Sequence, residues 1–194
     1  MKTISRVYDT YAQARDAVTA VEASGVATDD LSVVANKYVS EKYADVHEVS
    51  APAATGAGVG GALGGGAGLL AGLGLMAIPG LGPVVAVGWL AATAVGAAAG
   101  AATGGVVGAL VGAGDSETNA HVYSESVRRG GTLVSVRVKD EDAGRVQAIL
   151  DRYTPIDPAL RAAEYRKEGW TTFDPNAPPY RPSETEIDRI RRVS

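Results

Sequence analysis

The residues that could carry chemistry are few in this 194-residue chain, and they do not converge. There is no cysteine, which excludes disulfides, thiolate zinc sites and cysteine nucleophiles. His47 and His121 have no neighbours at metal-ligand spacing, and no serine lies in a G-x-S-x-G elbow. Arg128 and Arg129 precede two glycines, which is typical of a helix C-terminus; phosphate binding there would be unspecific. The sequence therefore predicts no catalytic or metal-binding residues and a protein that is not an enzyme.

A nucleotide cofactor is also not predicted. The stretch "GAGVGG" at 56–61 matches G-x-G-x-x-G, but "SAPAAT" before it is a poor strand, and no acidic residue follows until Asp115. No lysine follows these glycines, so there is no Walker pattern either. The net charge of -4 argues against a nucleic-acid partner, and no small-molecule substrate is evident.

The most unusual feature is a window of 66 uncharged residues between Glu48 and Asp115 that holds 20 of the 25 glycines. The companions of these glycines are apolar, which is untypical of a flexible linker. The composition divides the chain into four segments, namely 1–50, 51–114, 115–153 and 154–194.

The first segment predicts a β-α-β unit. Residues 3–8 and 31–36 are typical of strands, and Ala14, Ala17, Val18 and Val21 recur at helical spacing between them. Thr10 and Gln13 have capping-box spacing, and Gly25 is a natural helix stop.

The third segment predicts an α-β-α unit. Its elements are a helix capped by Asp115 or Ser116 that ends near Arg129, a strand at 132–138 and a helix capped by Asp140 or Asp142. Neither half can bury enough apolar surface alone, so we expect one small domain of about 90 residues. Its sheet would have three or four strands, with helices on one face.

The uncharged segment 51–114 contains two series of small residues at intervals of four. They are predicted helix-packing residues: Gly56, Gly60, Gly64, Gly68 and Gly72 in the first series, and Gly88, Ala92, Gly96, Gly100, Gly104, Gly108 and Gly112 in the second. A predicted turn lies between them at Pro79, Gly80, Gly82 and Pro83. If the turn centres near residue 80, facing positions sum to 160, so the two series fall into register. The spacing predicts an antiparallel glycine-zipper helical hairpin.

Two environments could stabilise such a hairpin. Each arm of 25 to 30 residues would be about 37–45 Å long, enough to cross a hydrocarbon core of about 30 Å. The alternative is a soluble homo-oligomer whose hairpins bury one another. The uncharged arms disfavour a third possibility, an ion-selective pore.

The segment 154–194 contains six of the nine prolines. We expect an extended tail with short helices in "AEYRKEG" and "SETEIDRIRR", and with Trp170, Phe173 and Tyr180 as anchors onto the domain or a neighbouring subunit. A linear recognition motif is the alternative. The predicted fold class is α+β: a small β-α-β/α-β-α sandwich domain, interrupted by the helical hairpin and followed by a Pro-rich tail.

The segments "ISRVYDTYAQARDAVTAVEASGVATDDLSVVAN" and "AHVYSESVRRGGTLVSVRV" together resemble bacterial heat-induced or general stress proteins of the YflT-like type. The resemblance implies a bacterial, non-enzymatic, stress-associated protein. With the hairpin, the expected function is membrane anchoring or homo-oligomerisation, with the protein itself and the lipid bilayer as partners. The expected location is the cytoplasmic face of the inner membrane, or alternatively a soluble cytoplasmic assembly.

Overall fold

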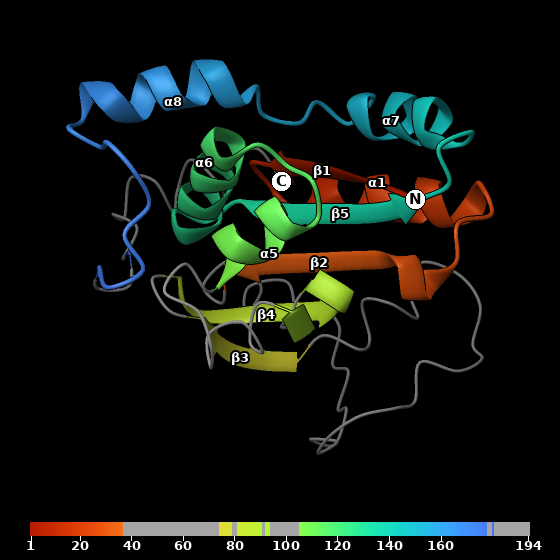
Figure 1. Ribbon diagram of the computed structural model, residues 1–194, viewed down its shortest axis with the longest axis horizontal. Helices are drawn as coiled ribbons and strands as arrows, with labels where there is room; N and C mark the ends of the chain where they lie inside the picture. The colour runs from red at the N-terminus through yellow and green to blue at the C-terminus, as the bar shows by residue number, and fades with distance from the viewer. Residues whose placement is uncertain (37–73, 79–80, 91, 94–104, 178–179, 181–194) are drawn as a thin grey trace.

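A computed structural model describes residues 1–36, 74–78, 81–90, 92–93, 105–177 and 180 of the chain (Figure 1). Within these residues, five strands form one sheet in the order β1-β5-β2-β4-β3, and every neighbouring pair is antiparallel. The predicted α+β class is confirmed at this level, while the sheet is larger than expected.

The N-terminal β-α-β unit forms as predicted. It comprises β1 (Lys2–Tyr8), α1 (Tyr11–Ala23), the short 3-10 helix η1 (Thr28–Asp30) and β2 (Leu31–Asn36). Thr10 and Gln13 make the capping box at the start of α1, and Gly25 follows the helix with φ +93°. This positive φ is accessible to glycine without strain, so the helix ends here.

The second unit also forms as predicted, with α6 (Glu117–Arg128), β5 (Thr132–Val138) and α7 (Ala143–Asp151). Ser116 caps α6 by accepting a hydrogen bond from the backbone N–H of Asn119. Asp142 is the first residue before α7, but its side chain makes no capping hydrogen bond. Strand β5 lies between β1 and β2, so the two sequence halves complete one sheet.

The helical-hairpin prediction is wrong for residues 74–78 and 82–88. They form β3 (Gly74–Ile78) and β4 (Gly82–Gly88), and β4 pairs with β2. The run from Val84 to Val87 contains three β-branched residues, which fit a pleated sheet better than a helix. The free edge of β2 also provides hydrogen-bonding partners. This part of the segment 51–114 therefore belongs to the α/β sheet rather than to a separate insert.

The predicted turn position survives this change of secondary structure. Gly74 lies opposite Ala86, and Ile78 lies opposite Gly82, so facing positions sum to 160 as expected. Gly82 and Pro83, however, are residues of β4 rather than of the turn. Proline is tolerated near the start of a strand because it removes only one ladder donor.

Helices cover both faces of the sheet, so the prediction of helices on one face is also wrong (Figure 1). Helices α1 and α7 bury one apolar face against side chains that include Ile4, Val33 and Val134. Helix α5 (Val106–Gly112) and helix α6 bury the other face. The second face is covered because α5 packs beside α6 over β1, β5, β2 and β4.

The chain after α7 closes one edge of the sheet. The backbone N–H of Ile156 donates to the carbonyl oxygen of Val7 in edge strand β1 at 2.8 Å. Helix α8 (Pro158–Lys167) then packs against α6, and Phe173 is buried in the same core as α5. Trp170 packs against the cluster that contains Val122 of α6, and the ring of Tyr180 lies against Arg128 and Arg129, so all three expected aromatic anchors contact the domain. The predicted helix in "SETEIDRIRR" lies outside the described residues.

The predicted packing residues lie in a strand, in helices or outside the described residues. Gly88 ends β4 rather than lying in a helix, Ala92 lies in a short helical turn, and Gly108 and Gly112 lie in α5. The others, which lie outside the described residues together with Pro79 and Gly80, are Gly56, Gly60, Gly64, Gly68, Gly72, Gly96, Gly100 and Gly104. Across the described ranges, no helix combines the length and apolarity that a membrane crossing requires.

Candidate functional site: the arginine–glutamate cluster of α6

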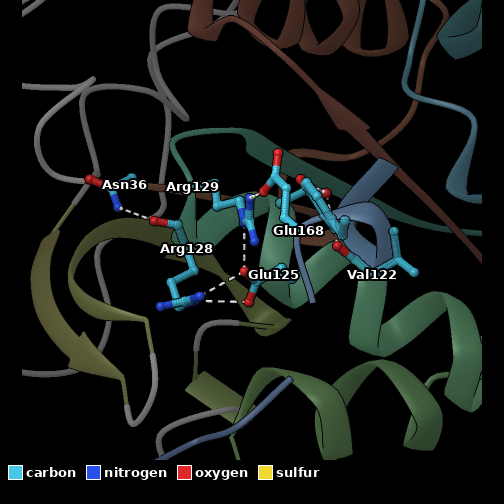
Figure 2. Close-up of polar contacts among 8 residues, drawn as sticks. Asn36, Val122, Glu125, Arg128, Arg129 and Glu168 are labelled. Carbon is cyan, nitrogen blue, oxygen red and sulfur yellow. Dashed lines mark hydrogen bonds and ion pairs between the residues drawn. The ribbon is translucent and has the colours of Figure 1, made fainter. Parts of the chain in front are cut away.

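The most concentrated group of described charges lies at the end of α6 (Figure 2). Glu125 is only 1% exposed and accepts hydrogen bonds from both following arginines. Arg128 donates from Nε at 2.9 Å and from Nη2 at 2.7 Å, and Arg129 donates from Nε at 2.6 Å. A carboxylate can be buried here because two guanidinium groups replace the water that it loses.

The local sequence brings these three side chains together. Residues three and four apart lie on one side of a helix, so Glu125 faces both Arg128 and Arg129. Gly130 then adopts φ +109°, which ends α6 directly after the arginines. Two cations in the last turn also interact favourably with the negative end of the helix dipole.

Arg129 connects this cluster to the C-terminal part of the chain. Its Nη1 forms an ion pair with Glu168, just after α8. Its guanidinium lies 4.3 Å from the ring centroid of Tyr165 and 5.6 Å from that of Tyr180. Burial alone would lower the pKa of Arg129, but the hydrogen bonds to Glu125 and Glu168 raise it above its usual range. Arg129 therefore keeps its charge at any relevant pH.

Further contacts extend the cluster to the sheet and to α8. Asn36, at the end of β2, donates from Nδ2 to the carbonyl oxygen of Arg128 at 3.1 Å. The Tyr165 hydroxyl donates to Ser126 Oγ at 3.1 Å, and Ser126 donates to the carbonyl oxygen of Val122. Burial raises the pKa of Tyr165, so this phenol stays protonated and remains a donor.

The cluster is arranged to hold structural elements together. Its two cations are matched by Glu125 and Glu168, and both guanidinium groups also lie over aromatic rings. A general base or nucleophile needs an approachable atom with an adjustable pKa, and the charged groups here are engaged with one another. What the arrangement can do is fix α8 and the following chain to the end of α6.

A second polar group lies where α5 meets α6. Ser5 Oγ donates to Asp115 Oδ2 at 2.6 Å, and Ser135 Oγ donates to Ser5 Oγ at 3.1 Å. Burial raises the pKa of Asp115 above its usual range, while the hydrogen bond from Ser5 opposes that shift. Ser5, Ser135 and Ser32 lie opposite one another across three strands; Ser5 and Ser135 lead to Asp115, whereas Ser32 donates to the carbonyl oxygen of Val87.

The other residues considered from the sequence are not part of either group. His121 Nδ1 lies 3.0 Å from Thr172 Oγ1, and its Nε2 lies 3.9 Å from Glu117. His47 lies outside the described residues. No group of three or more histidine, cysteine or acidic residues that could hold a metal ion occurs in the part of the chain that the structure describes.

Sequence reasoning identified the arginine pair but missed Glu125 as its partner. The signal was present as an acidic residue three and four positions before two arginines. What the sequence could not supply was the burial of that carboxylate, or the contacts that join the two arginines to α8 and β2.

Comparison with known proteins adds no relative. No protein-family model matches this chain, and neither a curated protein nor a solved structure matches it.

Proposed function

We propose that this protein is a non-enzymatic scaffold that works by self-association, and that two copies join through strand β3. The observation that carries the proposal is the nature of this edge. Among the described residues β3 pairs only with β4, and its sequence, GLMAI, contains no charge and no proline.

The two edges of the described sheet differ in their protection against strand addition. Edge strand β1 carries Lys2 and Arg6, and it receives the backbone hydrogen bond from Ile156. Charged side chains and covering segments are the usual means by which edges avoid unwanted pairing. Strand β3 has no such charge, which supports its use as a pairing edge.

Antiparallel pairing of β3 with β3 of a second copy would join two five-stranded sheets. An uncharged strand meets an uncharged strand in this arrangement, and the surrounding glycine-rich window adds no repulsion. A second copy is therefore the partner that suits this edge. In keeping with the resemblance in the sequence, we propose a stress-associated role for the assembly.

The uncharged window between Glu48 and Asp115 also favours a second candidate function. In this alternative, the window attaches the protein to the cytoplasmic face of the inner membrane. Flotation with vesicles of neutral and anionic lipids separates the two candidates. Protein that floats with vesicles supports attachment, whereas protein that stays at the bottom as a defined oligomer supports the soluble scaffold.

The direct test of β3 pairing is the substitution Ala77→Lys, measured by size-exclusion chromatography with light scattering over a dilution series. Lysine on an edge strand blocks addition because its charge cannot be buried in a new pair. We expect wild type to form dimers or larger species, and Ala77→Lys to lose the β3 contact, so that its mass at each dilution is smaller than that of wild type while its circular dichroism is unchanged.

The matched control is Gln147→Lys, which adds the same charge at an exposed position of α7. It should associate as wild type does. The proposal fails if wild type is monomeric throughout the series, or if Ala77→Lys and Gln147→Lys have the same mass.

A further inference from the structure

The part of the chain after α7 packs against the domain through buried side chains at several points along its length. We call residues 156–177 and 180 the C-terminal unit. Ile156 and Phe173 are buried in the core beneath α5 and α6. Ala162 and Tyr165 are buried against Val122 of α6. These contacts are non-covalent and of the kind that a second copy could make equally well.

Two ion pairs add specificity to this packing. Arg161 lies 2.8 Å from Asp9, which follows β1, and Glu168 pairs with Arg129. The arginines of both pairs are partly shielded from water, with exposed fractions of 24% for Arg161 and 18% for Arg129, while Asp9 and Glu168 are exposed. The C-terminal unit therefore contacts one particular surface, which consists of the end of β1 and the side of α6 from Val122 to Arg129.

The connection between this unit and α7 is short and strained. Thr154 has φ +51°, and among the described residues it is the only non-glycine residue with a positive φ. A β-branched side chain disfavours this conformation, and the following Pro155 restricts the backbone of Thr154 further. Thr154 is held in place by Gln13, whose Nε2 donates to Thr154 Oγ1 at 2.9 Å. Strain of this kind persists only where surrounding contacts enforce it.

We propose that two copies of this chain exchange their C-terminal units. In the exchanged dimer, the unit of one copy packs on α6 of the other, and Arg129 pairs with Glu168 of the partner subunit. The closed monomer and the exchanged dimer make the same contacts, so the connection at Thr154 decides between them. An extended connection lets Thr154 leave the left-handed region, which favours exchange.

This inference does not depend on strand β3. Exchange uses α6 and the β1 edge, at the opposite side of the sheet from β3. It also assigns a role to the arginine–glutamate cluster, which would be completed by the partner subunit's Glu168. The two modes of association can therefore be tested separately, by carrying Ala77→Lys in every protein below.

The first test uses the absence of cysteine in the chain. One protein carries Val122→Cys and another carries Ala162→Cys; they are mixed, partly unfolded, refolded together and oxidised. Oxidation follows only after refolding is complete, and each single-cysteine protein oxidised alone gives the background of random disulfides. A disulfide between the two proteins above that background requires the C-terminal unit of one copy to lie on α6 of the other. We expect a cross-linked heterodimer on a non-reducing gel.

The double variant, with both cysteines in one chain, is the positive control. The inference is overturned if the double variant cross-links within single chains while the mixture gives no heterodimer.

The second test changes the connection itself. Thr154→Asn keeps a side chain that can accept from Gln13 but tolerates positive φ, so it favours the closed monomer. Because each dimer contains two such connections, we expect the dimer dissociation constant of Thr154→Asn to be about tenfold or more above that of the threonine protein. Thr154→Val keeps the β-branch and loses the hydroxyl, so its dissociation constant should equal that of the threonine protein or fall below it.

A third variant, with Thr154 and Pro155 deleted, shortens the closed connection by two residues, so it should disfavour the closed monomer and be a dimer. A folded monomer of this deletion variant, or equal dissociation constants for Thr154→Asn and Thr154→Val, would refute the exchange.

Discussion

The sharpest test of the sheet is the substitution Gly88→Ala at the end of β4. Gly88 has φ +92° and lies opposite Ser32 of β2. A Cβ atom added here would lie 2.2 Å from the carbonyl oxygen of Leu31 and 2.7 Å from the Cα of Ser32. Both atoms belong to the backbone of an interior strand, so neither can move without disturbing the sheet.

The expected loss of stability follows from two contributions. A non-glycine residue held at such a φ costs about 1–3 kcal/mol. Displacing Leu31 also weakens two hydrogen bonds at this junction, at about 1 kcal/mol each. They run from Ser32 Oγ to the carbonyl of Val87 at 2.8 Å and from Trp89 Nε1 to that of Asp30 at 3.3 Å. We therefore expect Gly88→Ala to lower the free energy of unfolding by about 3–5 kcal/mol, a large share of a typical 5–15 kcal/mol.

The assay is denaturant unfolding followed by circular dichroism, with Gly112→Ala as the matched control. Gly112 lies in α5, and a Cβ there would meet nothing within 4 Å. Because glycine in a helix is about 1 kcal/mol less favourable than alanine, Gly112→Ala should be neutral or stabilising by up to about 1 kcal/mol. A loss below about 1 kcal/mol for Gly88→Ala would refute the close approach of β4 to β2.

Three further results are expected. Glu125→Ala should lower the free energy of unfolding by about 3–5 kcal/mol because it removes the buried carboxylate that accepts hydrogen bonds from both arginines. Exposed Glu117→Ala should change it by less than about 0.5 kcal/mol, and equal unfolding midpoints would contradict this. Phe173→Ala should lower the free energy of unfolding in urea by about 3–5 kcal/mol because Phe173 is buried. Exposed Leu160→Ala should lower it by less than about 0.5 kcal/mol. A small loss for Phe173→Ala would mean that the tail is not part of the cooperative core. The folded-state pKa of Asp115 is raised, so its contribution to stability is largest below the ordinary carboxyl range and falls as pH rises through the raised pKa. Asp115→Asn should lack this fall in an acid titration of unfolding free energy, and curves parallel to wild type would contradict the assignment.

Local signals predicted the outer units of the fold correctly. The Thr10–Gln13 capping box, the stop at Gly25 and the alternating strand at 132–138 each depend on residues close in sequence. Such signals do not depend on distant parts of the chain, because they satisfy the hydrogen-bonding needs of backbone groups that are close in sequence.

The glycine spacing misled the prediction where tertiary pairing decides. Intervals of four are compatible with a row of small residues along a helix. Between 82 and 88, however, Val84, Val85 and Val87 favour a strand, and the open edge of β2 gives that strand a partner. The register around residue 80 was nevertheless correct. In any antiparallel pair, of strands or of helices, the numbers of two facing residues add up to twice the number at the centre of the turn. The need for glycine at Gly88 comes from Leu31, 57 positions away in the sequence.

The candidate site was only half predictable. The arginine pair was recognised from its position before two glycines, but neither the burial of Glu125 nor the ion pair between Arg129 and Glu168 could be predicted. No sequence periodicity connects positions 39 residues apart. The strain at Thr154 was likewise invisible, since a Thr-Pro pair is ordinary in an extended connection.

The position of β5 between β1 and β2 has a consequence during synthesis on the ribosome. The first two strands are complete at Asn36, but their shared neighbour ends only at Val138. At about 5–20 residues per second, roughly a hundred further residues take about 5–20 s to make. Throughout that interval, the apolar faces of β1, α1 and β2 emerge without the strand that joins them, while the long uncharged window is being added. The nascent chain is thus a natural client for chaperones until its final third has left the exit tunnel.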